Sequence, residues 1–103
     1  MHDLDTLQRL IVKQAVDKGW KQDAMYCIRR TFDELKELEE AIQSNKPAEV
    51  IAVEAIDCLY FILQAIENKA PEISMNDMFD KKYYENWSML KKTEDENGSK
   101  VLR

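Results

Sequence analysis

Apolar residues recur along this chain with the spacing of an α-helix, and short polar segments separate four such stretches. Apolar side chains at every third or fourth position line one face of a helix. In the first stretch this face contains Leu4, Leu7, Ile11 and Ala15. We therefore predict an all-α fold without strands, in which helices cover residues 4–18, 22–44, 47–69 and 74–91.

The residues at the borders of these stretches are typical helix ends. Asp3 and Ser74 precede apolar runs and can accept hydrogen bonds from N–H groups of a first helical turn. Gly19 suits the position after a helix C-terminus, and Pro47 suits the first helical position, where an N–H would have no partner. The short connections predict a four-helix bundle-like domain over residues 1–91, with the second and third helices as antiparallel neighbours.

The length and charge of the chain restrict its classes of function. A chain of 103 residues fits one small domain that buries only about two thirds of its unfolded surface, so association with further copies would stabilise it. A net charge of −5 argues against sequence-independent binding to nucleic acid, which needs a basic face. Neither a run of about 20 apolar residues nor a signal peptide pattern is present, so no membrane is involved and the expected location is cytoplasmic. Residues 92–103 show no apolar period and predict a mobile charged tail.

The cysteines and the single histidine offer little for a metal or redox site. Cys27 and Cys58 form no CxxC pair, so we expect two reduced and packed thiols. His2 lies near the N-terminus, where chain ends fray, which disfavours a histidine-based catalytic site.

Two acidic residues lie in the third stretch, where charges are least expected. From Val50 to Ile66 the sequence is apolar around almost the whole helix, and Glu54 and Asp57 are its only charged residues. Such a helix should be buried, and the spacing of three places both carboxylates on one face. Burying an unpaired carboxylate costs several kcal/mol, so a positive charge is expected to face them.

A second acidic pair, Glu34 and Glu37, lies on the preceding helix with the same spacing. If the two helices are antiparallel neighbours, the pairs converge into a cluster of four carboxylates. Such hard oxygen ligands favour Mg²⁺, with Mn²⁺ as an alternative, over zinc. Two simpler interpretations stay open. The pair on the second helix could form a solvated acidic face, or the carboxylates could pair with the basic residues Arg29, Arg30 and Lys36.

The segments DELKELEEAI and VEAIDCLY together give the pattern ExxE, then sixteen residues, then ExxD. This pattern resembles the MazG-like family of all-α nucleoside triphosphate pyrophosphohydrolases. Asp33 stands where that family typically has a first Glu, and Val53 replaces a frequent acidic residue. The resemblance covers about residues 7 to 90 and implies a MazG fold assembled as a homodimer or homotetramer. It also implies one or two Mg²⁺ ions held by the metal ligands Glu34, Glu37, Glu54 and Asp57.

The resemblance implies a reaction as well. The substrate would be a nucleoside triphosphate, and the products would be the nucleoside monophosphate and pyrophosphate, an activity that cleans the nucleotide pool. Metal ions would neutralise the polyphosphate, and Glu34 or Glu37 would orient the attacking water as catalytic base. The chain has no GxxxxGK[ST] loop to cradle phosphate, so the metals would carry phosphate recognition.

Further substrate contacts come from the same resemblance. Lys82 and Asn86 match a KxxxN that relatives use near the phosphate and the base, although Met89 stands where many relatives have Arg. Asn86 is interpreted equally well as an ordinary exposed helix residue. Trp20 matches a Trp near the end of the first helix and would stack on a base or pack in the core. Apart from the resemblance, we expect the positive charge of Arg30 to complement the negative charge of the phosphates.

Two other functions fit the same residues. A dUTPase, a dCTPase or a phosphoribosyl-ATP pyrophosphohydrolase of the same superfamily would share the carboxylates and differ in the pocket. A non-catalytic helical dimerisation module would pair the carboxylates with basic side chains instead. Saturable Mg²⁺ binding separates the enzyme from the module. The sequence names neither the base nor the sugar of the nucleotide.

Overall fold

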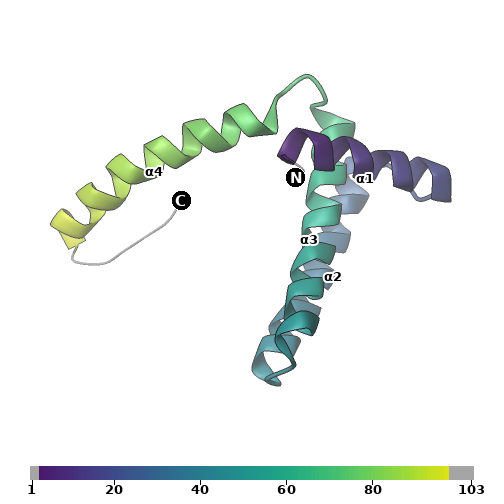
Figure 1. Cartoon of the computed structure of the whole chain (residues 1–103), viewed down its shortest axis with the longest axis horizontal. Coiled ribbons are helices and arrows are strands. Elements are labelled where there is room, and N and C mark those ends of the chain that lie inside the picture. The colour runs from purple at the N-terminus through teal and green to yellow at the C-terminus, as the bar shows by residue number, and fades with distance from the viewer. Residues whose placement is uncertain (1–2, 98–103) are drawn as a thin grey trace. The chain divides into compact units, whose positions relative to one another are not determined.

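The computed structural model describes residues 3–97 and contains four α-helices (Figure 1). They are α1 (Leu4–Lys18), α2 (Ala24–Gln43), α3 (Ala48–Lys69) and α4 (Met75–Asn97). No strand occurs among the described residues, which confirms the predicted all-α class.

The chain divides into two compact units, residues 1–72 and residues 73–103. The first unit contains α1, α2 and α3, and the second contains α4. The packing of all four helices in one bundle, within a domain that spans residues 1–91, stays a prediction.

Local hydrogen bonds set several helix ends where the sequence placed them. The Asp3 side chain accepts a hydrogen bond from the Thr6 N–H at 2.8 Å, and Ser74 Oγ accepts one from the Asp77 N–H at 3.2 Å. Gly19 ends α1 in the left-handed region, with a φ of 71°. These residues confirm both ends of α1 and the expected start of α4.

Four other helix ends differ from the expected ones, and one of them is the C-terminus of α2, which lies at Gln43 instead of residue 44. α2 begins later because Asp23 is its N-cap and accepts a hydrogen bond from the Tyr26 N–H at 3.1 Å. Pro47 is the N-cap of α3 rather than its first helical residue, because its ψ of 150° is not helical. α4 continues to Asn97, so part of the segment that we expected to be a mobile tail is helical. Residues 98–103 lie outside the described part of the chain.

In the first unit, α3 packs against both α1 and α2 (Figure 1). α2 and α3 form an antiparallel hairpin, and α1 lies across the end of this hairpin that is opposite its turn. The buried apolar core is small and consists of Ile11, Ala15, Cys27, Ala41, Cys58, Leu63 and Ala65. Both cysteines are free and buried, as predicted.

Amide side chains hold the connection between α1 and α2 against α3. Gln64 Nε2 donates a hydrogen bond to the Lys21 carbonyl oxygen at 2.9 Å, and Asn68 Nδ2 donates one to Gln22 Oε1 at 3.0 Å. Gln64 is only 2% exposed, so losing its hydrogen bond would leave a buried amide unpaired. The connection, which carries Trp20, is thereby fixed beside α3.

The apolar faces of α2 and α3 are wider than one copy of the chain covers. On α2, one face is buried, but the apolar residues further round the helix are exposed, namely Met25, Phe32, Leu35 and Ile42. On α3, the exposed apolar residues are Val50, Val53, Ile56 and Ile62. The expectation that the third helix is buried all round is therefore wrong for a single chain, because α1 and α2 cover only part of its circumference.

Candidate metal centre and adjoining pocket

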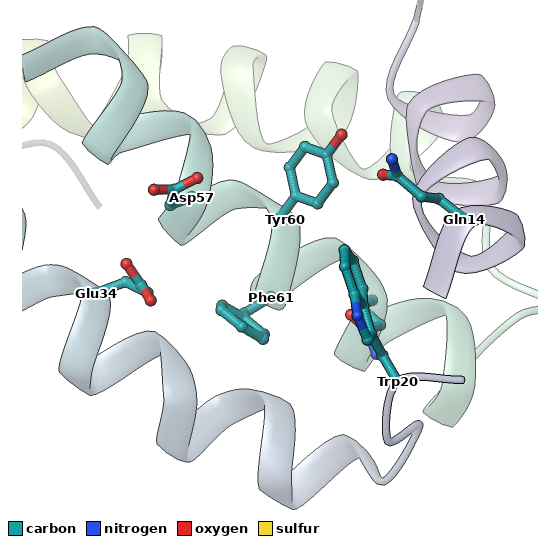
Figure 2. Close-up of a pocket in the computed structure, with 7 residues that line it drawn as sticks. Gln14, Trp20, Glu34, Asp57, Tyr60 and Phe61 are labelled. Atoms are coloured by element: carbon teal, nitrogen blue, oxygen red, sulfur yellow. The ribbon is translucent and has the colours of Figure 1, made fainter. Parts of the chain in front are cut away.

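Three carboxylates from two helices meet in the first unit. Glu34 lies on α2, and Glu54 and Asp57 lie three residues apart on α3. One oxygen from each of these groups lies within 4.8 Å of the other two. Figure 2 shows the Glu34 and Asp57 side chains on facing helices, turned toward the space between them. The structure thus brings together three of the four predicted metal ligands.

The spacing of these oxygens is close to what one divalent cation requires. Mg²⁺ holds oxygen ligands at about 2.1 Å, so two ligands on opposite sides of the ion are about 4.2 Å apart. The three oxygens lie within 4.8 Å of one another, so each pair is at most about half an ångström wider than that span. Because the ligands are all carboxylate oxygens, the cluster fits Mg²⁺ or Mn²⁺ better than zinc.

Glu37, the fourth predicted ligand, lies at the solvent-facing edge of the cluster. It is exposed and is not one of the three closely spaced groups. It is nevertheless near enough to raise the pKa of both Glu34 and Glu54. The site therefore consists of three partly or largely buried carboxylates and one that faces water.

Burial and mutual repulsion disfavour the charged forms of two of these carboxylates. Loss of hydration raises the pKa of Glu34, and the nearby Glu37 and Asp57 raise it further. Loss of hydration also raises the pKa of Glu54, together with repulsion from the same two neighbours. Glu54 Oε2 is buried, and no hydrogen-bond partner for it occurs among the described residues. A cation among these groups would relieve the repulsion and pair with that oxygen.

One basic side chain pairs with part of the cluster. Arg30 Nη2 lies 3.2 Å from Glu34 Oε1, and Arg30 Nη1 lies 3.1 Å from Asp33 Oδ2. Among the side chains that the structure describes, no Lys or Arg forms an ion pair with Glu54 or Asp57. Pairing with a basic residue, the simpler interpretation of the sequence, therefore accounts for Glu34 alone.

A pocket of about 360 Å³ adjoins the carboxylates (Figure 2). The residues that line it are Gln14, Trp20, Glu34, Asp57, Tyr60, Phe61 and Gln64. In Figure 2 the two carboxylates lie at one end of this group, and Trp20 and Gln14 lie at the other. Aromatic walls with a few polar groups suit a planar organic ligand, and the acidic end suits a cation bound beside it.

Sequence reasoning included Trp20 in the site but missed four other lining residues. Tyr60, Phe61 and Gln64 follow Asp57 by three, four and seven positions, which is the spacing of one helix face. Extending the face from Asp57 would therefore have found them. Gln14 lies on α1, and no spacing rule connects it with α3.

The two predicted substrate-binding residues of α4 lie in the second unit. Lys82 Nζ is 4.0 Å from Glu85 Oε2, one turn along the same helix, and Asn86 is partly buried. A shared site of these residues with the carboxylates stays a prediction. His2 lies outside the described residues.

Comparisons with known proteins add no assignment. No protein-family model matches the chain, and neither curated proteins nor solved structures gave a match. Within residues 3–97, no helix combines the length and the apolar character that crossing a membrane requires. The geometry of the carboxylates and of the adjoining pocket therefore carries the functional argument.

Proposed function

We propose that this chain is a Mg²⁺-dependent nucleotide pyrophosphohydrolase that converts nucleoside triphosphates to nucleoside monophosphates and pyrophosphate. The observation that carries the proposal is the meeting of Glu34 with Glu54 and Asp57 at one end of an aromatic-lined pocket. A cation site beside a site for a planar ring fits the two chemical halves of a nucleotide. The resemblance of DELKELEEAI and VEAIDCLY to the MazG-like family supports the same reaction.

The four carboxylates divide the chemical tasks. Bound Mg²⁺, or Mn²⁺ in its place, would neutralise the polyphosphate and lower the pKa of a coordinated water. Glu34, Glu54 and Asp57 hold the cation, because their oxygens are the closely spaced set. Glu37 accepts the proton of the attacking water, because it faces solvent at the edge of the cluster and is available to a water there.

The pocket receives the nucleoside half of the substrate. Trp20 is 47% exposed, so its indole has a free surface on which a base can stack. Gln14 and Tyr60 present an amide and a hydroxyl on the pocket wall, which can hydrogen-bond to the edge of a base. In this proposal Lys82 of α4 binds the phosphate and Asn86 hydrogen-bonds to the base, as the resemblance of KxxxN implies.

Near-isosteric substitution of the ligands tests the proposal. Glu54→Gln and Asp57→Asn each remove one ligand charge while keeping the shape of the side chain. We expect Mg²⁺-dependent pyrophosphate release, measured over a panel of canonical and oxidised nucleoside triphosphates, to fall by about 100-fold in each variant. Glu40→Gln is the matched control, because Glu40 is exposed on α2 and belongs to no cluster. Wild-type turnover in Glu54→Gln would overturn the proposal.

A homodimer or homotetramer is part of the same proposal. The exposed apolar residues Met25, Phe32, Leu35 and Ile42 recur at intervals of seven, three and seven along α2, which places them on one face. Exposed apolar residues that share one face of a helix are typical of protein interfaces. A second copy of the chain would cover this face and leave the contacts between Glu34 and α3 unchanged.

A non-catalytic dimerisation module is the second candidate, and the Arg30–Glu34 ion pair favours it. In that case, basic side chains of the protein itself neutralise the negative charges of the cluster. Titration calorimetry with MgCl₂ and MnCl₂ separates the two functions. The module predicts no saturable binding and no rise in melting temperature, whereas the enzyme predicts both.

A further inference from the structure

Arg30 lies where the acidic cluster meets the pocket. Its guanidinium contacts Glu34 in the cluster and Asp33 outside it, at 3.2 and 3.1 Å. The guanidinium carbon also lies 5.3 Å from the centre of the Phe61 ring, which is part of the pocket wall. One positive side chain therefore contacts a cluster carboxylate, a second carboxylate in solvent and an aromatic wall.

We infer that Arg30 pairs with Glu34 while no metal ion is bound. Once a metal ion binds to Glu34, the Arg30 guanidinium instead pairs with the phosphates of the substrate. This inference rests on the proposed function. The Glu34 side chain is only 11% exposed, so in the metal-free protein its charge needs a nearby partner. Among the described side chains, Arg30 is the one that forms an ion pair with a carboxylate of the cluster.

Metal binding works against the contact between Arg30 and Glu34. A divalent ion held by Glu34 would lie close to the guanidinium, which is 3.2 Å from a Glu34 oxygen, and like charges at short distance repel. The guanidinium does not lose its position when it leaves Glu34, because Asp33 and the Phe61 ring still contact it. The Arg30 side chain is 39% exposed, so its N–H groups remain open to a ligand.

The chemistry of the side chain fits a phosphate on the metal. A guanidinium presents paired N–H donors in one plane, which match two oxygens of a phosphate group. A lysine at the same position keeps the positive charge, but it lacks both the paired donors and the stacking on Phe61. The inference therefore predicts different behaviour for Arg30→Gln, which loses the charge, and Arg30→Lys, which loses only the shape.

Magnesium affinity in the absence of nucleotide is the first measurement. Titration calorimetry with MgCl₂ should show that Arg30→Gln binds Mg²⁺ about tenfold more tightly than wild type, because a competing positive charge is gone. Arg30→Lys should stay near the wild-type affinity. Arg29→Gln is the matched control, because Arg29 is exposed, lies on the same helix and forms no ion pair within the described residues.

Turnover is the second measurement. Both Arg30 variants should raise the KM for the nucleoside triphosphate about tenfold, through loss of a paired phosphate contact, while kcat changes less. Circular dichroism confirms that the variants remain helical. A role that merely stabilises α2 would lower the melting temperature without tightening Mg²⁺ binding.

The outcomes separate this inference from the proposed function. Unchanged or weaker Mg²⁺ binding by Arg30→Gln overturns the inference and leaves the enzyme proposal standing. Saturable binding by both proteins, tighter in Arg30→Gln than in wild type, supports the inference. Absence of saturable binding in both proteins overturns the inference together with the proposed metal site.

Discussion

Among the residues that the structure describes, no basic side chain forms an ion pair with Glu54. One of its oxygens is buried without a hydrogen-bond partner among the described residues, and two acidic neighbours repel its charge. In the absence of a metal, protonation is the simplest way to relieve both effects. The stability of the metal-free protein should therefore depend on pH through Glu54 and through Glu34, whose pKa is raised for the same reasons.

The direction of this pH dependence follows from the raised pKa values. A group with a raised folded-state pKa contributes stability that is complete below its unfolded pKa, about 4.3 for Glu, and lost as the pH rises through the folded-state value. In EDTA we expect the melting temperature to fall as the pH rises above the unfolded pKa of Glu, about 4.3. Differential scanning calorimetry measures the trend, and Glu54→Gln should weaken it because that variant removes one titrating group.

Saturating Mg²⁺ should reverse the same trend. Metal binding requires deprotonated carboxylates, so metal-dependent stabilisation grows with pH. At a Mg²⁺ concentration about 100 times the Kd, the stabilisation is about 2.7 kcal/mol. A metal-free protein whose stability rises as the pH increases above about 4.3 would contradict the raised pKa values of Glu34 and Glu54.

At the scale of elements, both ends of α1 and the start of α4 were predictable because their signals are local. Asp3, Gly19 and Ser74 act on N–H and C=O groups within a few residues, so the sequence alone contains the cause. The exposed side of α3 was not predictable in this way. Which part of a helix is covered depends on where its neighbours cross, and residues far away in the chain decide that.

The candidate site was predictable in part, because the spacing of its carboxylates along each helix is also a local property of the sequence. The three-residue spacing of Glu54 and Asp57 fixes them on one face of α3, and the antiparallel hairpin brings α2 alongside. The sequence did not determine how α2 is rotated about its axis. That rotation turns Glu34 inward and leaves Glu37 in solvent, although both residues belong to the ExxE motif.

The C-terminus of α1 offers a test of one element end. Gly19 has a φ of 71°, and a Cβ added there would meet no atom within 4 Å. Gly19→Ala should therefore lower the free energy of unfolding through backbone strain alone, by about 1 kcal/mol. Urea denaturation measures the loss. Gly19→Asn, which tolerates the left-handed conformation better, should lose less, and equal losses in the two variants would contradict this explanation.

At the scale of the whole molecule, the exposed apolar face of α2 predicts self-association. Phe32 and Leu35 are 64% and 45% exposed in the single chain. Replacing both with Lys places charges in an interface that we expect to be apolar, which should shift the protein toward a monomer of 12.1 kDa. Size-exclusion chromatography with light scattering measures the mass. Glu40→Lys is the control, because Glu40 is an exposed residue of α2 outside that face. A wild-type protein that is already monomeric would contradict the prediction.

The amide contacts that hold the connection between α1 and α2 make the pocket wall at Trp20 structurally independent of the acidic cluster. Gln64 and Asn68 hold this connection, and with it Trp20, through side chains that take no part in the acidic cluster. Substitutions in the connection can thus reshape the wall that meets a ligand and leave the carboxylates on α2 and α3 unchanged. Under the proposed function, ligand preference can therefore diverge among descendants of this chain while the carboxylates proposed to hold the cation stay the same.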